Sequence, residues 1–401
     1  MPIAYCWRSW LGLLALTLGA APPAQTVWTV NPGNPIQPAI QAASPGDVVV
    51  LTYGFYDPFY LDRGLTIRGN GAMVGSQVPP WGSVTVAIPP GQVAHLDAIN
   101  FFQGVSPGSA IGCPVALGGN VRVDRCTFLS RTWAPALSIG NAQVVIGGSS
   151  VIAGVWTGSG VALQAFGSQI TLRDSSVTGA WAGCHPSGCW TQFAATNAAV
   201  FQNCTVHAER TTFLGGSHMI APLTGDGAAA IDDTGGILWL ADCTVTGGSS
   251  AAGNGATALV HAGTTPVELR STQLIAGTPG GGTSTGALNP TAPLLRLQLQ
   301  PVWTRGMTST LTLRGDPNAL HALFLTPAAT AASVPSVVVE PAWTAGAVAL
   351  AAGMLDAAGD AVYIVPVPNV ASLLHAPVWC QAASGAVFPL RASTIAGGVV
   401  R

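Results

Sequence analysis

VRVDRCTF, residues 121–128, is one of seven eight-residue lines in this chain that share a common pattern. The other six are AHLDAINF (94–101), VVIGGSSV (144–151), ITLRDSSV (170–177), AVFQNCTV (199–206), LWLADCTV (238–245) and VELRSTQL (267–274). Positions one, three and eight are always apolar, positions four and five are mostly polar or glycine, and position six is small or apolar. Because strict alternation breaks after position three, each line predicts two short strands joined by a bend.

The spacing of the lines predicts a solenoid. Their sixth positions follow one another at intervals of 23 to 39 residues, which is the period of stacked repeat units. Successive coils would pair as parallel strands and hold equivalent side chains about 4.8 Å apart. We therefore expect one buried apolar row made of Leu96, Val123, Ile146, Leu172, Phe201, Leu240 and Leu269.

The repeated pattern resembles the right-handed parallel β-helix of the pectin-lyase-like superfamily, which implies an all-β fold. Ile36, Ile40 and Ala43 lie at helical spacing before a Ser-Pro-Gly stop, similar to the N-terminal cap helix of many secreted β-helix proteins. After about residue 290, segments that alternate with period two and are cut by Pro and Gly predict a small antiparallel β-sandwich. Residues 353–382 in this part resemble a C-terminal β module of secreted bacterial proteins.

The start of the chain predicts export. Arg8 precedes the apolar run at residues 11–20, which is too short to cross a bilayer and is followed by small residues and Pro. No other stretch qualifies as a transmembrane segment, so we expect a secreted or cell-surface protein. The expected organisation is a signal peptide at 1–24, a β-helix at 25–290 and a β-sandwich at 291–401.

Composition narrows the class of partner. Only 7% of the residues are charged, while 49% are hydrophobic, so the chain is not an intrinsically disordered one. The 14 basic residues are all arginines and form no basic run, so nucleic acid is not expected as a partner. A polysaccharide or a surface protein is the expected partner.

The cysteines fit an oxidising compartment. Cys184 and Cys189 flank a Pro-Ser-Gly turn, and we expect a small-loop disulfide there, with a zinc site that uses His185 as the alternative. Cys204 and Cys243 share position six of successive lines, which allows either a disulfide between adjacent coils or a row of reduced, buried thiols.

Tryptophans recur at one place in three successive coils. Trp133 and Trp156 each lie seven residues after position six, and Trp181 lies six residues after it. A row of flat aromatic faces suits the apolar faces of sugar rings and predicts a ligand platform. The alternative is an aromatic stack that only shields one corner of the coil.

Position five carries a row of oxygen ligands in consecutive lines, namely Asp174, Asn203 and Asp242. Oxygen ligands on neighbouring coils could hold Ca²⁺. Resemblance to the polysaccharide lyases of this superfamily implies such a column together with an Arg or Lys base. The alternative is that Asp and Asn occupy bends because they bond the local backbone.

The longest interval between lines holds a dense set of ionisable residues. They are His207, Glu209, Arg210, His218, Asp226, Asp232 and Asp233. The Asp232–Asp233 pair resembles the paired acids of β-helix glycoside hydrolases, in which one carboxyl protonates the leaving oxygen and another activates water. The remaining motifs of those enzymes, Asn-Thr-Asp, Gly-His-Gly and Arg-Ile-Lys, do not occur in the chain, and a Gly-rich turn is the alternative.

Two functions follow from these observations. The first is a non-enzymatic exported protein that binds glycan or a partner protein with its β-helix and needs no cofactor. The second is a polysaccharide lyase or glycoside hydrolase, which would draw its catalytic residues from Glu209, Arg210, His218, Asp226, Asp232 and Asp233. Only the lyase would use Ca²⁺.

Overall fold

A computed structural model gives the architecture of the protein. The structure describes residues 25–76, 82–103, 115–130, 134–154, 160–182, 194–218, 225–289, 296–299, 302–326, 337–338, 348–370, 377–385, 390–392 and 396–400. The proposed signal peptide at 1–24 lies outside these ranges. No helix in the described ranges is long and apolar enough to cross a membrane.

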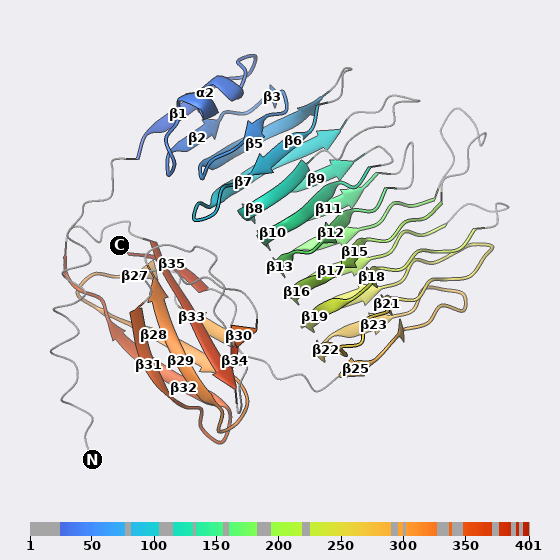
Figure 1. Ribbon diagram of the computed structural model, residues 1–401. Helices are drawn as coiled ribbons and strands as arrows, with labels where there is room; N and C mark the ends of the chain where they lie inside the picture. The colour runs from blue at the N-terminus through green and yellow to red at the C-terminus, as the bar shows by residue number, and fades with distance from the viewer. Residues whose placement is uncertain are drawn as a thin grey trace.

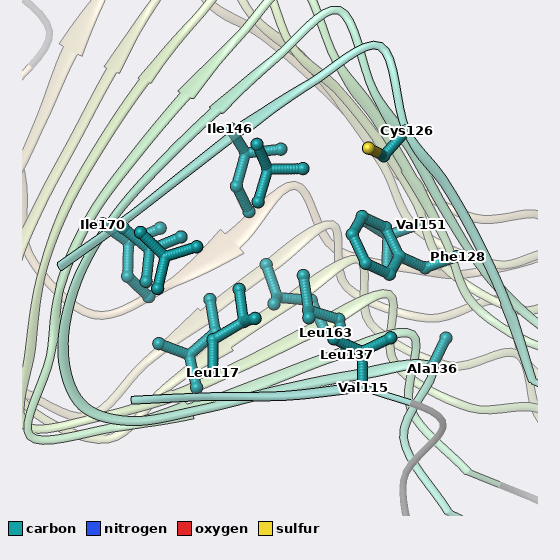
Figure 2. Packing of buried hydrophobic residues seen from close by; sticks show 14 of the residues in the cluster. Val115, Leu117, Cys126, Phe128, Ala136, Leu137, Ile146, Val151, Leu163 and Ile170 are labelled. Atoms are coloured by element: carbon teal, nitrogen blue, oxygen red, sulfur yellow. The ribbon is translucent and has the colours of Figure 1, made fainter. Parts of the chain in front are cut away.

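The strands from Val27 to Asn289 form a parallel β-helix, which confirms the predicted solenoid. Strands β1 to β25 belong to one continuous sheet in which every recorded pairing is parallel and joins one coil to the next (Figure 1). The coil has three sides around a closed apolar interior (Figure 2). We call these sides face 1, face 2 and face 3.

Each face is a stack of short strands, and the longer strands continue round a bend from one face to another. The long strands are β5 (Thr66–Ser76), β7 (Ala94–Gln103), β8 (Val115–Asp124) and β10 (Leu137–Gly147). Face 1 also contains β2 (Val48–Leu51), β13 (Gln169–Arg173), β16 (Cys204–Glu209), β19 (Gly236–Ala241), β22 (Val267–Arg270) and β25 (Leu288–Asn289). Face 2 also contains β3 (Phe55–Tyr56), β9 (Thr127–Ser130), β11 (Ser150–Ala153), β14 (Ser176–Thr178), β17 (Thr212–Leu214), β20 (Thr244–Thr246) and β23 (Gln273–Ile275). Face 3 also contains β4 (Tyr60–Leu61), β6 (Val84–Ala87), β12 (Leu163–Phe166), β15 (Ala199–Gln202), β18 (Ile231–Asp233), β21 (Leu259–His261) and β24 (Ser284–Thr285).

The buried row of face 1 follows the prediction except in one coil. The register joins Ile67, Leu96, Val123, Ile146, Leu172, Ala208, Leu240 and Leu269, all of them buried. The predicted Phe201 lies instead in the row of face 3, between Ala165 and Asp233. The assignment of AVFQNCTV to face 1 was therefore wrong. The segment that occupies this place in the coil is VHAERTTF (206–213).

The interior is one hydrophobic cluster that runs through all the coils. Phe101 and Phe128 stack on adjacent coils of face 2, with ring centroids 5.0 Å apart and planes 11° apart. Each fully buried Leu, Ile or Phe in such a row contributes roughly 1.5–3 kcal/mol from burial. The short helix α2 (Gln37–Ala42) joins the same cluster through Ile40, and β1 (Val27–Val30) pairs with β2, so the predicted N-terminal cap is confirmed.

The bend between faces 1 and 2 needs a left-handed backbone in every coil. The residue at position five has a φ of 46° to 55° throughout, and these residues are Ala98, Arg125, Gly148, Asp174, Arg210, Asp242 and Ser271. Position six then bridges the coils, because the Ser149 hydroxyl accepts a bond from the Cys126 N–H at 3.0 Å and the Ser175 hydroxyl accepts one from the Ser149 N–H at 3.2 Å. Position five is thus constrained by the left-handed backbone, and the serines at position six by their bonds between coils.

The C-terminal part forms the predicted sandwich. One sheet is three-stranded, β26 (Arg296–Leu299), β28 (Thr308–Arg314) and β32 (Asp360–Pro366). The other contains β27 (Val302–Trp303), β29 (Leu320–Thr326), β30 (Val337–Val338), β31 (Val348–Met354), β33 (Pro377–Gly385), β34 (Leu390–Ala392) and β35 (Ala396–Val400). Leu311, Leu323 and Cys380 share one core that joins the two sheets. Most pairs are antiparallel, but β27–β35 and β30–β34 are parallel.

The bend at position five generates a test of stability. Ala98 has a φ of 55°, a conformation that costs an L residue roughly 1–2 kcal/mol, while glycine loses about 0.5–1 kcal/mol of chain entropy. We expect Ala98→Gly to raise the free energy of unfolding by up to about 1 kcal/mol in urea denaturation. The control is Ala94→Gly, a buried strand position, which should be destabilising. If Ala98→Gly lowered the free energy of unfolding as much as Ala94→Gly does, the left-handed backbone at position five would not be what constrains that residue.

Candidate functional site

Face 1 concentrates the charged residues of the chain on its outer surface. One outward row consists of His95, Arg122, Val145, Thr171, His207, Trp239 and Glu268. The next consists of Arg68, Asp97, Asp124, Gly147, Arg173, Glu209, Ala241 and Arg270, beside the bend residues Arg125, Asp174, Arg210 and Asp242. Six of the fourteen arginines and six of the sixteen acidic residues thus lie on this face. In contrast, the strands described on faces 2 and 3 have only one outward charged side chain, Asp232.

A buried carboxylate organises the first part of face 1. Asp97 is 2% exposed and accepts bonds from two arginines. Arg68 Nε lies 3.1 Å from one carboxylate oxygen, while Arg125 Nε and Nη2 lie 3.0 and 2.6 Å from the other. The side chains of Arg68 and Arg125 remain 55% and 69% exposed. Three successive coils are joined by this one carboxylate.

A second carboxylate lies beside the first. His95 Nε2 lies 2.8 Å from an Asp124 oxygen, and Arg122 Nε lies 2.5 Å from the same oxygen. Burial opposes ionisation of Asp124, but the bond with His95 and the charge of Arg122 outweigh it and lower the pKa of Asp124 to about 2. Asp124 is therefore ionised at neutral pH.

The middle of face 1 holds a third network. Arg210 makes a bidentate pair with Asp174, with Nε and Nη2 at 2.6 and 2.9 Å from its two oxygens, and Nη1 bonds Glu209. The bond from Arg210 lowers the pKa of Asp174 and the pairing raises that of Arg210. Planar pairs of this kind are among the strong charge-assisted hydrogen bonds in proteins.

The predicted calcium column is not assembled in the register. Arg210 occupies position five in the coil between Asp174 and Asp242. Asn203 lies at the bend between faces 3 and 1, where Asn141 and Gly167 also have a positive φ. A guanidinium thus lies where the column needed an oxygen. Within the described ranges, no group of three His, Cys, Asp or Glu residues is placed to hold a metal ion.

Two aromatic rings on face 1 point outward and are nevertheless buried. His207 is 1% exposed and Trp239 is 7% exposed, with ring centroids 3.9 Å apart. Among the described residues, neither nitrogen of His207 nor Nε1 of Trp239 has a hydrogen-bond partner. Burial, and to a lesser degree the charge of Arg173, hold the pKa of His207 well below its usual value, so the ring is neutral at pH 7.

The burial of His207 predicts a pH dependence of stability. The unfolded ring takes up a proton below about pH 6.5, whereas the folded ring does not, so stability should fall as the pH falls. We expect the wild type to lose roughly 1 kcal/mol per pH unit below pH 6.5 from this group, and His207→Phe and His207→Leu to lack that component. Urea denaturation between pH 5 and pH 8 measures it. Identical pH profiles for all three proteins would refute the assignment.

The two adjacent acids of face 3 point in opposite directions. Asp232 faces outward and accepts a bond from Asn197 Nδ2 at 3.2 Å. Asp233 faces the interior, where an oxygen lies 2.6 Å from His261 Nδ1, and both side chains are at most 1% exposed. Since His261 Nε2 bonds the Thr265 carbonyl at 2.7 Å, Nε2 carries a proton, and a second proton lies between Nδ1 and Asp233. Burial raises the pKa of Asp233, and the bond with His261 opposes this.

The interior pair predicts a large, recoverable loss of stability. His261→Leu leaves Asp233 buried without its partner, which should cost about 3 kcal/mol or more in the free energy of unfolding. The double variant Asp233→Leu with His261→Leu removes both polar groups and should recover most of that loss. Thermal and urea denaturation of the three proteins provide the measurement. A double variant as unstable as the single one would show that the pair has another role.

The other predicted catalytic residues lie on separate parts of the coil. Glu209 and Arg210 are on face 1. The His218 backbone forms isolated parallel bridges with Ala182 and Ser250, and the Asp226 carboxylate accepts a bond from the Asn254 N–H. The described residues therefore do not gather the six candidates into one constellation.

Two further predictions have different outcomes. Trp133, Trp156, Cys184 and Cys189 lie outside the described residues, while Trp181 is 50% exposed.

Cys204 and Cys243 are free, buried thiols, so the prediction of a disulfide between them was wrong. Cys204 pairs with Gly236 at the bend between faces 3 and 1, whereas Cys243 lies at the bend between faces 1 and 2, so the two never share a row.

The networks around Asp97 and Asp124 were not predicted from the sequence. Their signal was present in positions two and four of the lines, which hold His95 and Asp97 in one coil and Arg122 and Asp124 in the next.

Comparison of the chain with protein-family models, with curated proteins and with solved structures gave no match.

Proposed function

We propose that the protein is an exported, non-enzymatic β-helix that binds a glycan along face 1. The observation that carries the proposal is the gathering of twelve charged residues on one outer face of a chain with few charges. Parallel strands hold these side chains in straight rows, which suits a long polymer of repeating units. Two features of the sequence support the export that we propose. They are the resemblance of the repeats to the pectin-lyase-like superfamily and the apolar run at residues 11–20.

The arrangement of the acids supports binding over hydrolysis. A glycoside hydrolase needs two carboxyl groups that face the same bond, one of them protonated. On face 1, Asp97 is bonded to two arginines, and Asp174 and Glu209 both bond Arg210. Among the described carboxyl groups, the one with a raised pKa is Asp233, which lies inside the coil and bonds His261.

A glycan array with the full-length protein tests this function. We expect retention of at least one polysaccharide, with affinity that falls as salt rises because the contacts are charged. The same polysaccharide is then incubated with the protein and analysed for new reducing ends and for unsaturated products. Binding without either product supports the proposal. Product release would instead establish the alternative, a polysaccharide lyase or glycoside hydrolase, and the absence of any binding would refute the glycan proposal.

A further inference from the structure

We propose that Arg68 and Arg125 form a two-arginine clamp on face 1 that binds the sulfate esters of an acidic polysaccharide. This inference rests on the proposed function and names the ligand chemistry of one part of face 1. Arg68 lies on β5, Asp97 on β7, and Arg125 at the bend after β8, so the clamp spans three successive coils.

The clamp is set in place by the fold. Asp97, which is 2% exposed, fixes both guanidinium groups, one on each of its oxygens. Arginine side chains have a large rotamer entropy, and its loss normally weakens binding. Because Asp97 already orders both side chains, that cost falls on folding and not on association.

Both arginines keep donors for a ligand. The recorded bonds of Arg68 use Nε alone, and those of Arg125 use Nε and Nη2. Within the described part of the chain, Arg68 Nη1 and Nη2 and Arg125 Nη1 are therefore left for a ligand, on side chains that are 55% and 69% exposed. A sulfate ester has three terminal oxygens, which equals the number of these donor nitrogens on the two side chains. A planar carboxylate is satisfied by one guanidinium.

The charges around the clamp favour an anion. The neighbouring groups are Asp97, Asp124, Arg122 and His95, so three arginines face two carboxylates. Asp124 is engaged by Arg122 and His95. The positive charge in excess therefore lies on the exposed pair Arg68 and Arg125.

The test uses the full-length protein on a sensor surface with three probes: dextran sulfate, polygalacturonate and neutral dextran. The variants are the double Arg68→Gln with Arg125→Gln, and the double Arg68→Lys with Arg125→Lys. The lysine variant keeps two positive charges beside Asp97 and is expected to fold. It therefore still tests the clamp if the glutamine variant unfolds. Lysine lacks the planar fork of arginine. Arg314→Gln is the matched control, because Arg314 is 63% exposed and paired with Asp360 in the C-terminal sandwich.

We expect dextran sulfate to bind the wild type more tightly than polygalacturonate, and neutral dextran not to bind. The glutamine variant should weaken dextran sulfate binding by roughly tenfold or more and the lysine variant by several-fold, with a change below about twofold in Arg314→Gln. Tighter binding of polygalacturonate would overturn the sulfate assignment. Unchanged binding in the folded lysine variant would overturn the clamp. Retention of neutral glycans alone on the array would overturn the clamp and leave the proposed function standing.

Discussion

Parallel pairing between successive coils is the constraint on which the β-helix depends. The strands of each coil satisfy their backbone N–H and C=O groups through the coils above and below, so the register of one coil fixes that of the next. Equivalent residues must then lie in rows, as Val123, Ile146 and Leu172 do. Inward rows have to be apolar or paired, and the Asp233–His261 bond shows that two polar side chains meet this condition when each satisfies the other.

The same constraint shapes the outer surface. A charge placed outward on one coil lies about 4.8 Å from the next coil, where an opposite charge stabilises it and a like charge does not. Face 1 follows this rule, since Asp97 takes arginines from the coils on both sides and Asp174 takes Arg210 from the next. The charged networks therefore both join the coils and supply the polar groups of the outer surface. In the clamp, the carboxylate that joins the coils, Asp97, is buried, while Arg68 and Arg125 stay exposed.

Much of the fold could be predicted from the sequence because the rows leave a periodic signal. Six of the seven lines were identified in their true register, together with the cap helix and the sandwich. The fifth failed because two overlapping segments fit the pattern: AVFQNCTV on face 3 and VHAERTTF on face 1 both have apolar residues at positions one, three and eight, and AVFQNCTV has the larger Phe201 at position three, where VHAERTTF has Ala208. Periodicity identifies a row, but it does not say which of three faces the row belongs to.

That ambiguity also limited the candidate site. The assignment of one line to the wrong face placed Asn203 in the column of Asp174 and Cys204 in that of Cys243. Arg210 was a candidate residue, but its pairing with Asp174 was not predicted. The contacts between coils join residues far apart in sequence, such as Arg125 with Asp97 and Arg210 with Asp174, so one misplaced line gives wrong partners on both sides of it. The networks at Asp97 and Asp124 lie in correctly registered coils and follow from positions two and four once those positions are read as outward. The face of a residue, and not its spacing alone, decides whether it can contribute to a site.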